Sequence, residues 1–375
     1  MKILSDLIIK DKRVLLRVDF NVPLDANKKV KDATRIEEAL PTIKYLLAHE
    51  AKQIIILAHF GRPKGKVNEE MRLAPVAEKL QELLGEQVFY SKDLTVPTGR
   101  VALLENIRFY AGEEKNDPEF SKQLAGLADV YVNDAFGTAH RAHASTEGVA
   151  HLLPHAAGLL MQKEVENLTK VLTKPEHPVV AIIGGAKIST KIQLIKNLLP
   201  KVDSLLLAGA LANTVLLAQN HKVGKSLVEA GLTSTVKDLL DNKLRLPVDV
   251  ITAFKAEAGG EIHTRAVGEV LAGEMILDIG PDTVSMYSEL ISKAKTVVWN
   301  GPMGLFEIPD FSKGTLEIAK AVANSQAYSV IGGGETVEAV KGMGLADKIS
   351  FISTGGGAML EFLGGKNLPG VIALN

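Results

Sequence analysis

The residues Val179-Val180-Ala181-Ile182-Ile183-Gly184-Gly185-Ala186-Lys187 form a continuous apolar run that ends in two glycines and a lysine. An apolar run of five residues is typical of a strand buried on both faces of a parallel sheet. Glycines directly after such a strand let the backbone turn sharply and expose N–H groups that bind anions. The segment therefore predicts an α/β fold with an anion-binding turn at the end of a strand.

Similar apolar runs recur along the whole chain and are separated by amphipathic stretches. The predicted strands are Val14–Val18, Gln53–Ala58, Val101–Leu104, Val130–Val132, Val179–Ile183, Ser204–Leu207, Val248–Thr252, Thr296–Trp299, Ser329–Ile331 and Ser350–Ser353. The predicted helices are Arg35–His49, Leu73–Leu84, Pro118–Leu127, Met161–Leu172, Lys187–Leu199, Ala210–Gln219, Lys313–Ala323, Thr336–Met343 and Ala358–Leu363. The alternation predicts an α/β protein with two doubly wound parallel-sheet domains.

The border between the two domains is expected near the middle of the chain. The helical periodicity of Met161–Leu172 is ended by Lys174-Pro175-Glu176-His177-Pro178. We therefore expect a first domain over residues 1–155, a hinge helix and linker over 156–177, and a second domain over 178–364.

The overall composition excludes several classes of protein. The chain has 375 residues, a net charge of -1 and no cysteine, so it has no disulfide framework and no global basic field for nucleic acid. No run of apolar residues is long enough to cross a membrane, and Met1–Lys10 lacks the pattern of a signal peptide. We expect a cytoplasmic protein that is a monomer and has no nucleic-acid or membrane partner.

Basic side chains gather after the predicted strands of the first half, where eight of the ten arginines lie. The segments after these strands are Asp19-Phe20-Asn21, His59-Phe60-Gly61-Arg62, Glu105-Asn106-Ile107-Arg108 and Asn133-Asp134 with His140-Arg141 beyond, and Arg35 opens a helix. Because parallel strands present their carboxyl ends at one edge, these groups predict a site for a ligand with more than one acidic group. The alternative is that each arginine pairs with a carboxylate on the surface. Because arginines recur at successive strand ends, we favour the ligand site.

Glycines take the corresponding positions in the second half, where 25 of the 33 lie. Glycine-rich segments follow five predicted strands: Gly184-Gly185-Ala186-Lys187, Ala208-Gly209-Ala210, Asn300-Gly301-Pro302-Met303-Gly304, Gly332-Gly333-Gly334-Glu335-Thr336 and Thr354-Gly355-Gly356-Gly357. A helix over Lys187–Leu199 would place Lys187 and Lys191 one turn apart, so that both face one phosphate chain. Neither a complete Walker A sequence nor a G-x-G-x-x-G dinucleotide motif is present.

Several of these segments, in this order, resemble phosphoglycerate kinase over nearly the whole chain. They are Arg17-Val18-Asp19-Phe20-Asn21-Val22-Pro23, His59-Phe60-Gly61-Arg62-Pro63, Glu105-Asn106-Ile107-Arg108-Phe109, the stretch from Asn133 to His143, Gly184-Gly185-Ala186-Lys187 and Trp299-Asn300-Gly301-Pro302-Met303-Gly304. The resemblance implies two doubly wound domains joined by a hinge helix, with a C-terminal tail, here about 365–375, returning to the first domain. It also implies reversible, Mg²⁺-dependent phosphoryl transfer between 1,3-bisphosphoglycerate and ADP, giving 3-phosphoglycerate and ATP.

The resemblance implies that the first domain binds the acid substrate. Asp19 and Asn21, with Phe20 between them, would hold the hydroxyl and carboxyl end of 3-phosphoglycerate. The 3-phosphate would bind to His59, Arg62, Arg108 and Arg141, with Phe60 and Gly61 in the same segment. Arg35 would be catalytic and face the group in transfer.

The second domain would bind ADP or ATP. Lys187 would be catalytic and follow the phosphoryl group, and Gly356 would present a helix N-terminus to the same group. Lys191 would hold the nucleotide phosphates and Glu307 the ribose hydroxyls. The remaining nucleotide contacts would come from Gly333, Gly334, Glu335 and Thr336. The magnesium ligand is expected at Glu335, where the family usually has aspartate.

Chemistry and resemblance together predict direct in-line transfer in a closed interdomain cleft that excludes water. Two other functions remain as alternatives. A nicotinamide dehydrogenase would need a dinucleotide motif, and a non-catalytic anion-binding protein would not need five glycine turns with paired lysines.

Overall fold

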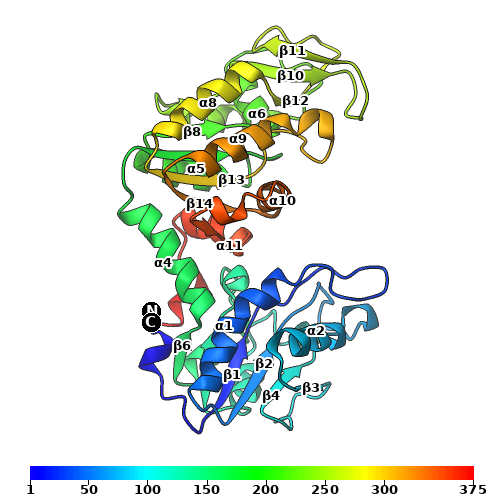
Figure 1. The fold of residues 1–375 in the computed structure, drawn as a ribbon, viewed down its shortest axis with the longest axis vertical. Coiled ribbons are helices and arrows are strands. Elements are labelled where there is room, and N and C mark those ends of the chain that lie inside the picture. The colour runs from blue at the N-terminus through cyan, green and yellow to red at the C-terminus, as the bar shows by residue number, and fades with distance from the viewer. The chain divides into compact units, whose positions relative to one another are not determined.

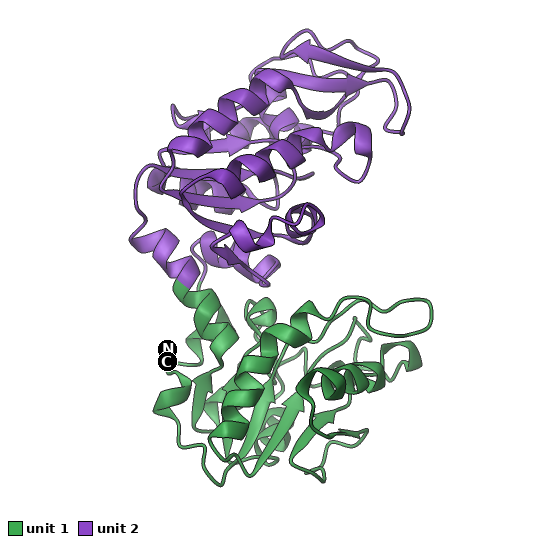
Figure 2. Cartoon of the chain, in the orientation of Figure 1, with its two compact units in different colours: residues 1–166, 367–375 green, residues 167–366 purple.

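The computed structural model describes all residues from 1 to 375, and the chain divides into two compact units (Figures 1 and 2). Unit 1 contains Met1–Glu166 and Asn367–Asn375, whereas unit 2 contains Asn167–Lys366. The boundary lies within helix α4 (Leu159–Thr173), in the region where a hinge helix was expected.

Unit 1 is built on a six-stranded sheet in which all neighbouring strands are parallel. Its strands are β1 (Arg13–Arg17), β2 (Gln53–Leu57), β3 (Val88–Ser91), β4 (Val101–Leu104), β5 (Val130–Asn133) and β6 (His155–Ala157). They are arranged in the order β3-β4-β2-β1-β5-β6. The chain first moves from β1 to β2 and later crosses to β5 on the other side of β1, so the switch point lies between β1 and β5. Ligands bind at such points in doubly wound sheets.

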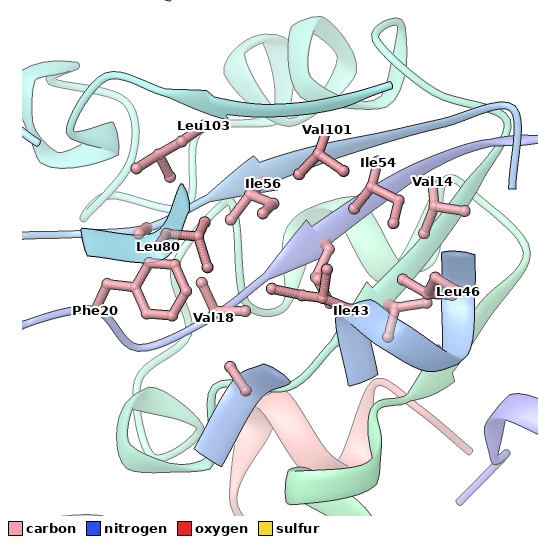
Figure 3. Close-up of a cluster of buried hydrophobic side chains, with 14 of the residues drawn as sticks. Val14, Val18, Phe20, Ile43, Leu46, Ile54, Ile56, Leu80, Val101 and Leu103 are labelled. Carbon is pink, nitrogen blue, oxygen red and sulfur yellow. The ribbon is translucent and has the colours of Figure 1, made fainter. Parts of the chain in front are cut away.

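Helices α1 (Thr34–Ala48), α2 (Ala74–Leu84) and α3 (Pro118–Ala125) complete the main structure of unit 1. Helix α1 buries Ile36, Ala39, Ile43 and Leu46, a spacing of three or four residues that places them on one face. Figure 3 shows Ile43 and Leu46 of this helix close to Val14 and Val18 of β1, with Ile54 and Ile56 of β2 beside them. This packing fixes the position of α1, and with it the residues at its N-terminus.

Unit 2 has a second six-stranded parallel sheet, arranged β15-β14-β13-β7-β8-β9. Its strands are β7 (Val179–Ile183), β8 (Ser204–Leu207), β9 (Leu244–Arg245), β13 (Thr296–Asn300), β14 (Tyr328–Gly332) and β15 (Phe351–Ile352). Each residue of β7 is buried, as expected for a central strand covered on both faces. The switch point of this sheet lies between β7 and β13.

The helices of unit 2, beside the end of α4, are α5 (Ile192–Leu198), α6 (Ala210–Ala218), α7 (Thr233–Lys237), α8 (Pro281–Lys293), α9 (Lys313–Asn324), α10 (Gly334–Gly342) and α11 (Gly357–Leu363). The short 3-10 helices of the whole chain are Leu4–Asp6, Glu69–Met71, Ile107–Phe109, Gly148–His151, Phe136–Thr138, Leu199–Lys201, Ala230–Leu232, Pro309–Phe311 and Ala346–Lys348.

The structure differs from the sequence-based prediction at Val248–Thr252. This segment corresponds to β10 (Asp249–Ala253), which lies in a separate antiparallel sheet between β11 (Ile262–Ala266) and β12 (Met275–Ile279). The edge position beside β8 in the parallel sheet is filled by the two-residue strand β9 instead.

The predicted helix over Lys187–Leu199 was also too long, because α5 begins only at Ile192. The segment before it is held in a turn by Glu229, whose carboxylate accepts hydrogen bonds from the Ser189 N–H (2.9 Å) and hydroxyl (2.6 Å). Lys187 and Lys191 are therefore not one helical turn apart, and the prediction that helical spacing directs both at one phosphate chain was wrong.

The C-terminal segment returns to unit 1, as the resemblance implied. Helix α12 (Pro369–Ile372) lies in this segment, and the Gly370 N–H donates to the Ala139 carbonyl at 2.9 Å. The Lys2 N–H donates to the Leu374 carbonyl at 2.7 Å, so both ends of the chain lie together on this unit. None of the helices combines the length and the apolar character needed to cross a bilayer.

Candidate functional site

The ends of β1 and β2 bring the first group of predicted residues together in unit 1. Arg17 and Leu57, the last residues of these parallel strands, are in register, so Asp19 and His59 occupy equivalent positions two residues further on. The Asp19 carboxylate pairs with Arg35 at the N-terminus of α1, and its other oxygen lies 3.8 Å from His59 Nδ1. Two strand ends and a helix N-terminus thus supply one polar cluster.

Burial and charge act in opposite directions on these two groups. Burial by itself would raise the pKa of the Asp19 carboxyl, but the surrounding basic groups, Arg35 and Arg17 among them, hold it below its usual value. Burial lowers the pKa of His59 well below 6.5; Asp19 opposes this, and the neighbouring arginines add to it. The cluster therefore combines an ionised carboxylate with a neutral imidazole at pH 7.

The segment after β2 is fixed by two asparagines. The Gly61 N–H donates to Asn21 Oδ1 at 2.9 Å. The buried Asn106 uses its amide fully: Nδ2 donates to the carbonyls of Phe60 and Met71, and Oδ1 accepts from the N–H groups of Phe60 and Arg108. Arg108 Nη1 in turn donates to the Gly61 carbonyl at 2.9 Å. These bonds hold the predicted residues on three strand ends in one arrangement.

A buried basic cluster lies around Arg108. Burial lowers the pKa of its guanidinium to about 10, and the charges of Arg17 and Arg141 act in the same direction. Its Nε has no hydrogen-bond partner, and its only ion pair, with Glu114, has a separation of 3.5 Å. Burial and the same three arginines, Arg108, Arg17 and Arg141, lower the pKa of His143 to about 3. A buried cation with an unpaired donor is a favourable position for a phosphate.

The side chains of three residues in the predicted segments do not belong to the polar and basic clusters described above. The Arg62 side chain is exposed and forms no hydrogen bond or ion pair. Phe20 is fully buried in the hydrophobic core, as Figure 3 shows, so only its backbone is available to a ligand. Asp134 accepts the N–H groups of Leu160 (2.9 Å) and Met161 (3.1 Å) and thereby caps α4. Its role is therefore structural.

The switch point of unit 2 is occupied by the ammonium group of Lys191. This group donates to the Gly184 carbonyl after β7 at 2.7 Å and to the Asn300 side chain at the end of β13 at 2.7 Å. Burial lowers the pKa of Lys191 to about 8, although Glu335 acts in the opposite direction. A cation is thus held at the point where doubly wound sheets bind their ligands.

The glycine turns around this lysine pack directly against one another. The Gly209 N–H donates to the Met303 carbonyl at 2.8 Å, and the Gly185 N–H donates to the Pro302 carbonyl at 3.1 Å. Gly209 has a φ of 71°, and a Cβ there would lie 2.7 Å from the Gly185 carbonyl oxygen. Glycine is required here by both the backbone conformation and the close approach.

A cavity of about 300 Å³ opens beside these turns. Gly185, Gly209 and Ala210 line one part of it, and apolar side chains such as Leu227, Val250 and Met275 line another. Both Glu307 and Glu335 also contribute to the lining. An apolar pocket with glycine turns and carboxylates is suited to a base, a phosphate chain and hydroxyl groups in one ligand.

A single carboxylate, that of Glu335, lies at the N-terminus of α10. Its side chain is exposed in the first turn of α10, directly after Gly333, whose φ is 95°. No group of three or more potential metal-ligating side chains exists in the chain. Mg²⁺ commonly binds proteins through one or two carboxylates and completes its coordination with phosphates and water, so this donor set fits a metal that arrives with a nucleotide.

Comparison with known proteins identifies the family. A model described as phosphoglycerate kinase matches residues 4–366. The chain is 56% identical to a phosphoglycerate kinase of Moorella thermoacetica and 53% identical to one of Koribacter versatilis, in each case over 99% of this chain and 98% of the relative. The chain belongs to the phosphoglycerate kinase family.

Solved structures agree with this assignment. The fold matches a phosphoglycerate kinase from Coxiella burnetii with a TM-score of 0.91, at 44% identity over 99% of this chain and 98% of that one. The phosphoglycerate kinase from Pyrococcus horikoshii matches with a TM-score of 0.87 at 35% identity, over 100% and 98% of the two chains. The chain is therefore a phosphotransferase with a carboxyl acceptor and has the phosphoglycerate kinase activity of glycolysis.

Three residues that were not predicted from the sequence organise the candidate site of this phosphoglycerate kinase. Arg17, Asn106 and Asn300 were noted only as parts of motifs, yet each makes several hydrogen bonds to site segments. The available signal was their position, since each is the last residue of a strand or lies within two residues of one. A polar side chain at a buried strand end needs partners, and these lie in the neighbouring turns.

Proposed function

We propose that unit 1 binds 3-phosphoglycerate or 1,3-bisphosphoglycerate and unit 2 binds ADP or ATP, within the phosphoglycerate kinase reaction. This assigns the acid domain to residues 1–155 with 365–375, and the nucleotide domain to 178–364, with the hinge helix and linker between them. The observation that carries the proposal is the pair of switch points, one surrounded by arginines and histidines and the other by glycine turns with a lysine.

The contacts in unit 1 support an acid site with two ends. The Asp19 carboxylate, paired with Arg35, is suited to the hydroxyl and carboxyl end of the acid. His59 lies beside Asp19 and would contribute to binding of the phosphate at the other end. The buried Arg108, whose Nε makes no hydrogen bond, is together with Arg141 suited to a phosphate. Arg62, Asn21 and the Phe60–Gly61 backbone complete the proposed site. Arg62 is exposed and unpaired, so it is free to turn toward an incoming phosphate.

In unit 2 the cavity supports a nucleotide site. Its apolar part fits a base, Glu307 is placed to accept hydrogen bonds from ribose hydroxyls, and Lys191 supplies positive charge at the phosphates. Gly333, Gly334 and Thr336 form the start of α10, whose N-terminal amides favour an anion. Glu335 would hold Mg²⁺, which, when bound, neutralises charge on the nucleotide phosphates.

Lys187, Arg35 and Gly356 are proposed to act on the group in transfer. In-line phosphoryl transfer requires positioning and charge stabilisation, because the attacking oxygen is already ionised. Lys187 is exposed in the turn after β7, and Arg35 is fixed to Asp19 at the start of α1. Gly356 precedes α11, which packs against α5. Since the two substrates bind different units, transfer requires the units to bring them together.

A coupled assay with ATP, magnesium and 3-phosphoglycerate tests the proposal. We expect ADP formation that depends on all three components. A change of pyridine-nucleotide absorbance without coupling enzymes would indicate a dehydrogenase, and binding of acid without turnover would indicate an anion-binding protein. Light scattering in solution tests the expected monomer, and fractionation of cells tests the expected cytoplasmic location.

A further inference from the structure

Arg17 is a fully buried cation at the end of β1, directly behind the proposed acid site. Its Nε donates to Ser145 Oγ at 2.8 Å, Nη1 donates to the Val18 carbonyl, and Nη2 lies 3.3 Å from His59 Nδ1. The buried carboxylate of Glu113 accepts from the same Ser145 hydroxyl at 2.6 Å. These contacts hold the guanidinium in one orientation, with one edge directed at the imidazole.

The direction of the Arg17–His59 hydrogen bond follows from chemistry. A guanidinium carries only donors, so Nδ1 of His59 must be the acceptor and carries no proton. The single proton of the neutral ring is then on Nε2. We propose that Arg17 is a positioning residue that holds His59 as the neutral Nε2–H tautomer, so that His59 binds the acid substrate as a hydrogen-bond donor and not as a cation.

Other charged groups face the same ring, and their balance supports the neutral form. Asp19 Oδ1 lies 3.8 Å from Nδ1 and would favour a proton there, but this oxygen accepts the Asn21 N–H at 3.2 Å and the carboxylate is paired with Arg35. Arg17, Arg108 and Arg35 all act against a positive charge on His59, and the ring is only 4% exposed. Three cations and burial thus disfavour the protonated ring, and only the Asp19 carboxylate favours it.

The second ring nitrogen is available to a ligand. No group of the chain hydrogen-bonds to Nε2. This nitrogen retains some solvent exposure, since it is not one of the buried polar atoms that lack a partner. An Nε2–H donor can bind a phosphate or carboxylate oxygen without any change in its own protonation. An imidazolium would instead lose its charge near neutral pH, and acid affinity would fall as the pH rises through 6 to 7.

Nuclear magnetic resonance of ¹⁵N-histidine-labelled enzyme measures the tautomer directly. We expect His59, assigned from the spectrum of His59→Gln, to show one protonated and one unprotonated ring nitrogen, without titration around pH 6.5, where a histidine ordinarily titrates. The proton should be on Nε2. An imidazolium, or a proton on Nδ1, in the unaltered enzyme would overturn the proposal.

Replacement of Arg17 tests its part in this arrangement. Arg17→Met removes the donor and leaves the Asp19 carboxylate 3.8 Å from Nδ1, so the His59 pKa should rise and the ring should titrate. Arg13→Met removes an arginine from the other end of β1, where it pairs with Asp129, and should leave the His59 signals unchanged. If Arg17→Met does not fold, Ser145→Ala releases one of the three contacts of Arg17 and should broaden or shift the same signals. Unchanged signals in the folded variants would show that Arg17 does not set the tautomer.

The inference rests on the proposed acid site, and the same samples separate the two. Addition of 3-phosphoglycerate should shift the His59 Nε2 signal while the ring stays neutral. A neutral Nε2–H ring that does not respond to the acid would overturn the assignment of His59 to the substrate but leave the Arg17–His59 relationship intact. A ring that responds to the acid but is protonated would retain the site and overturn the tautomer.

Discussion

The ammonium nitrogen of Lys191 lies 2.7 Å from the side-chain oxygen of Asn300, and this bond joins the N-cap of α5 to the end of β13. Asn300 Nδ2 also donates to the Gly332 carbonyl at 2.9 Å, at the end of β14. One lysine and one asparagine thus connect three strand-end segments of the nucleotide-binding unit. The lysine is buried without a carboxylate partner, so its charge is stabilised mainly by neutral oxygens.

We expect nucleotide binding to be accompanied by proton uptake at Lys191 near pH 8.5. The pKa of about 8 in the folded protein lies below the value of 10.5 for a free lysine, so the ammonium is partly deprotonated at this pH. Phosphate groups nearby would raise the pKa and draw in a proton. Calorimetry of ADP binding in two buffers with different ionisation enthalpies measures this uptake.

Lys191→Met should abolish the uptake, whereas the exposed lysine variant Lys196→Met should retain it. The lowered pKa of Lys191 also makes the stability of the folded protein depend on pH. The unfolded chain binds more protons than the folded one between about pH 8 and 10.5, so this group's contribution to the free energy of unfolding rises with pH over that interval. Equal proton uptake in Lys191→Met and the unaltered enzyme would contradict the assignment.

Lys187→Ala should lower kcat by about a hundredfold or more and change substrate affinities little. A contact made selectively with the group in transfer stabilises the transition state and not the bound substrates. Steady-state kinetics with both substrates varied checks this, with Lys196→Ala as the control on the same segment. A normal kcat with a raised KM would show that Lys187 is an ordinary substrate contact.

Arg108→Ala and Arg141→Ala should each weaken 3-phosphoglycerate binding by about 2–3 kcal/mol while leaving ADP binding unchanged. The Nε of Arg108 in the buried basic cluster makes no hydrogen bond, and a phosphate there would provide one. Isothermal titration calorimetry measures both affinities. Arg100→Ala is the matched control, because Arg100 donates only to the Leu47 carbonyl in the same unit. Undiminished acid affinity in the two test variants would remove these residues from the site.

Glu335→Gln should raise the magnesium concentration required for activity and weaken Mg-ADP binding, without affecting 3-phosphoglycerate. Glu335→Asp should retain activity, because a carboxylate one methylene shorter still reaches the ion or one of its waters. Magnesium titrations at fixed free nucleotide measure these effects. Glu338→Gln, one turn further along α10 and also exposed, is the control. Superimposable magnesium curves for the unaltered enzyme and Glu335→Gln would leave Glu335 only a stabilising role at the helix N-terminus, worth about 0.3–1 kcal/mol.

Much of the fold was predictable because buried parallel strands are continuous apolar runs. Val179–Ile183 and Ser204–Leu207 were predicted at the bounds that the structure has. The antiparallel position of β10 was missed because its apolar residues do not encode strand direction. The Gly259-Gly260 pair between β10 and β11 was the available signal of a hairpin turn.

The site was predictable only in part, because its geometry depends on distant partners. Helix α5 begins later than the pattern predicts because Ser189 binds Glu229, forty residues away. The orientation of His59 results from Arg17, whose own position depends on Ser145 and Glu113. Residue types at strand ends indicate the kind of ligand, but the pairing of these side chains is a property of the folded chain.

The division of the chain into units has a consequence for protein synthesis. Unit 2 is one continuous segment of about 200 residues, inserted between the two segments of unit 1. At roughly 5–20 residues per second, a ribosome needs about 10–40 s to make that insertion, and until then unit 1 lacks its final segment. The apolar surface that Leu374 and Val371 cover is therefore open on the nascent chain throughout this time. Chaperones that bind exposed apolar surface would thus encounter unit 1 for longer than unit 2.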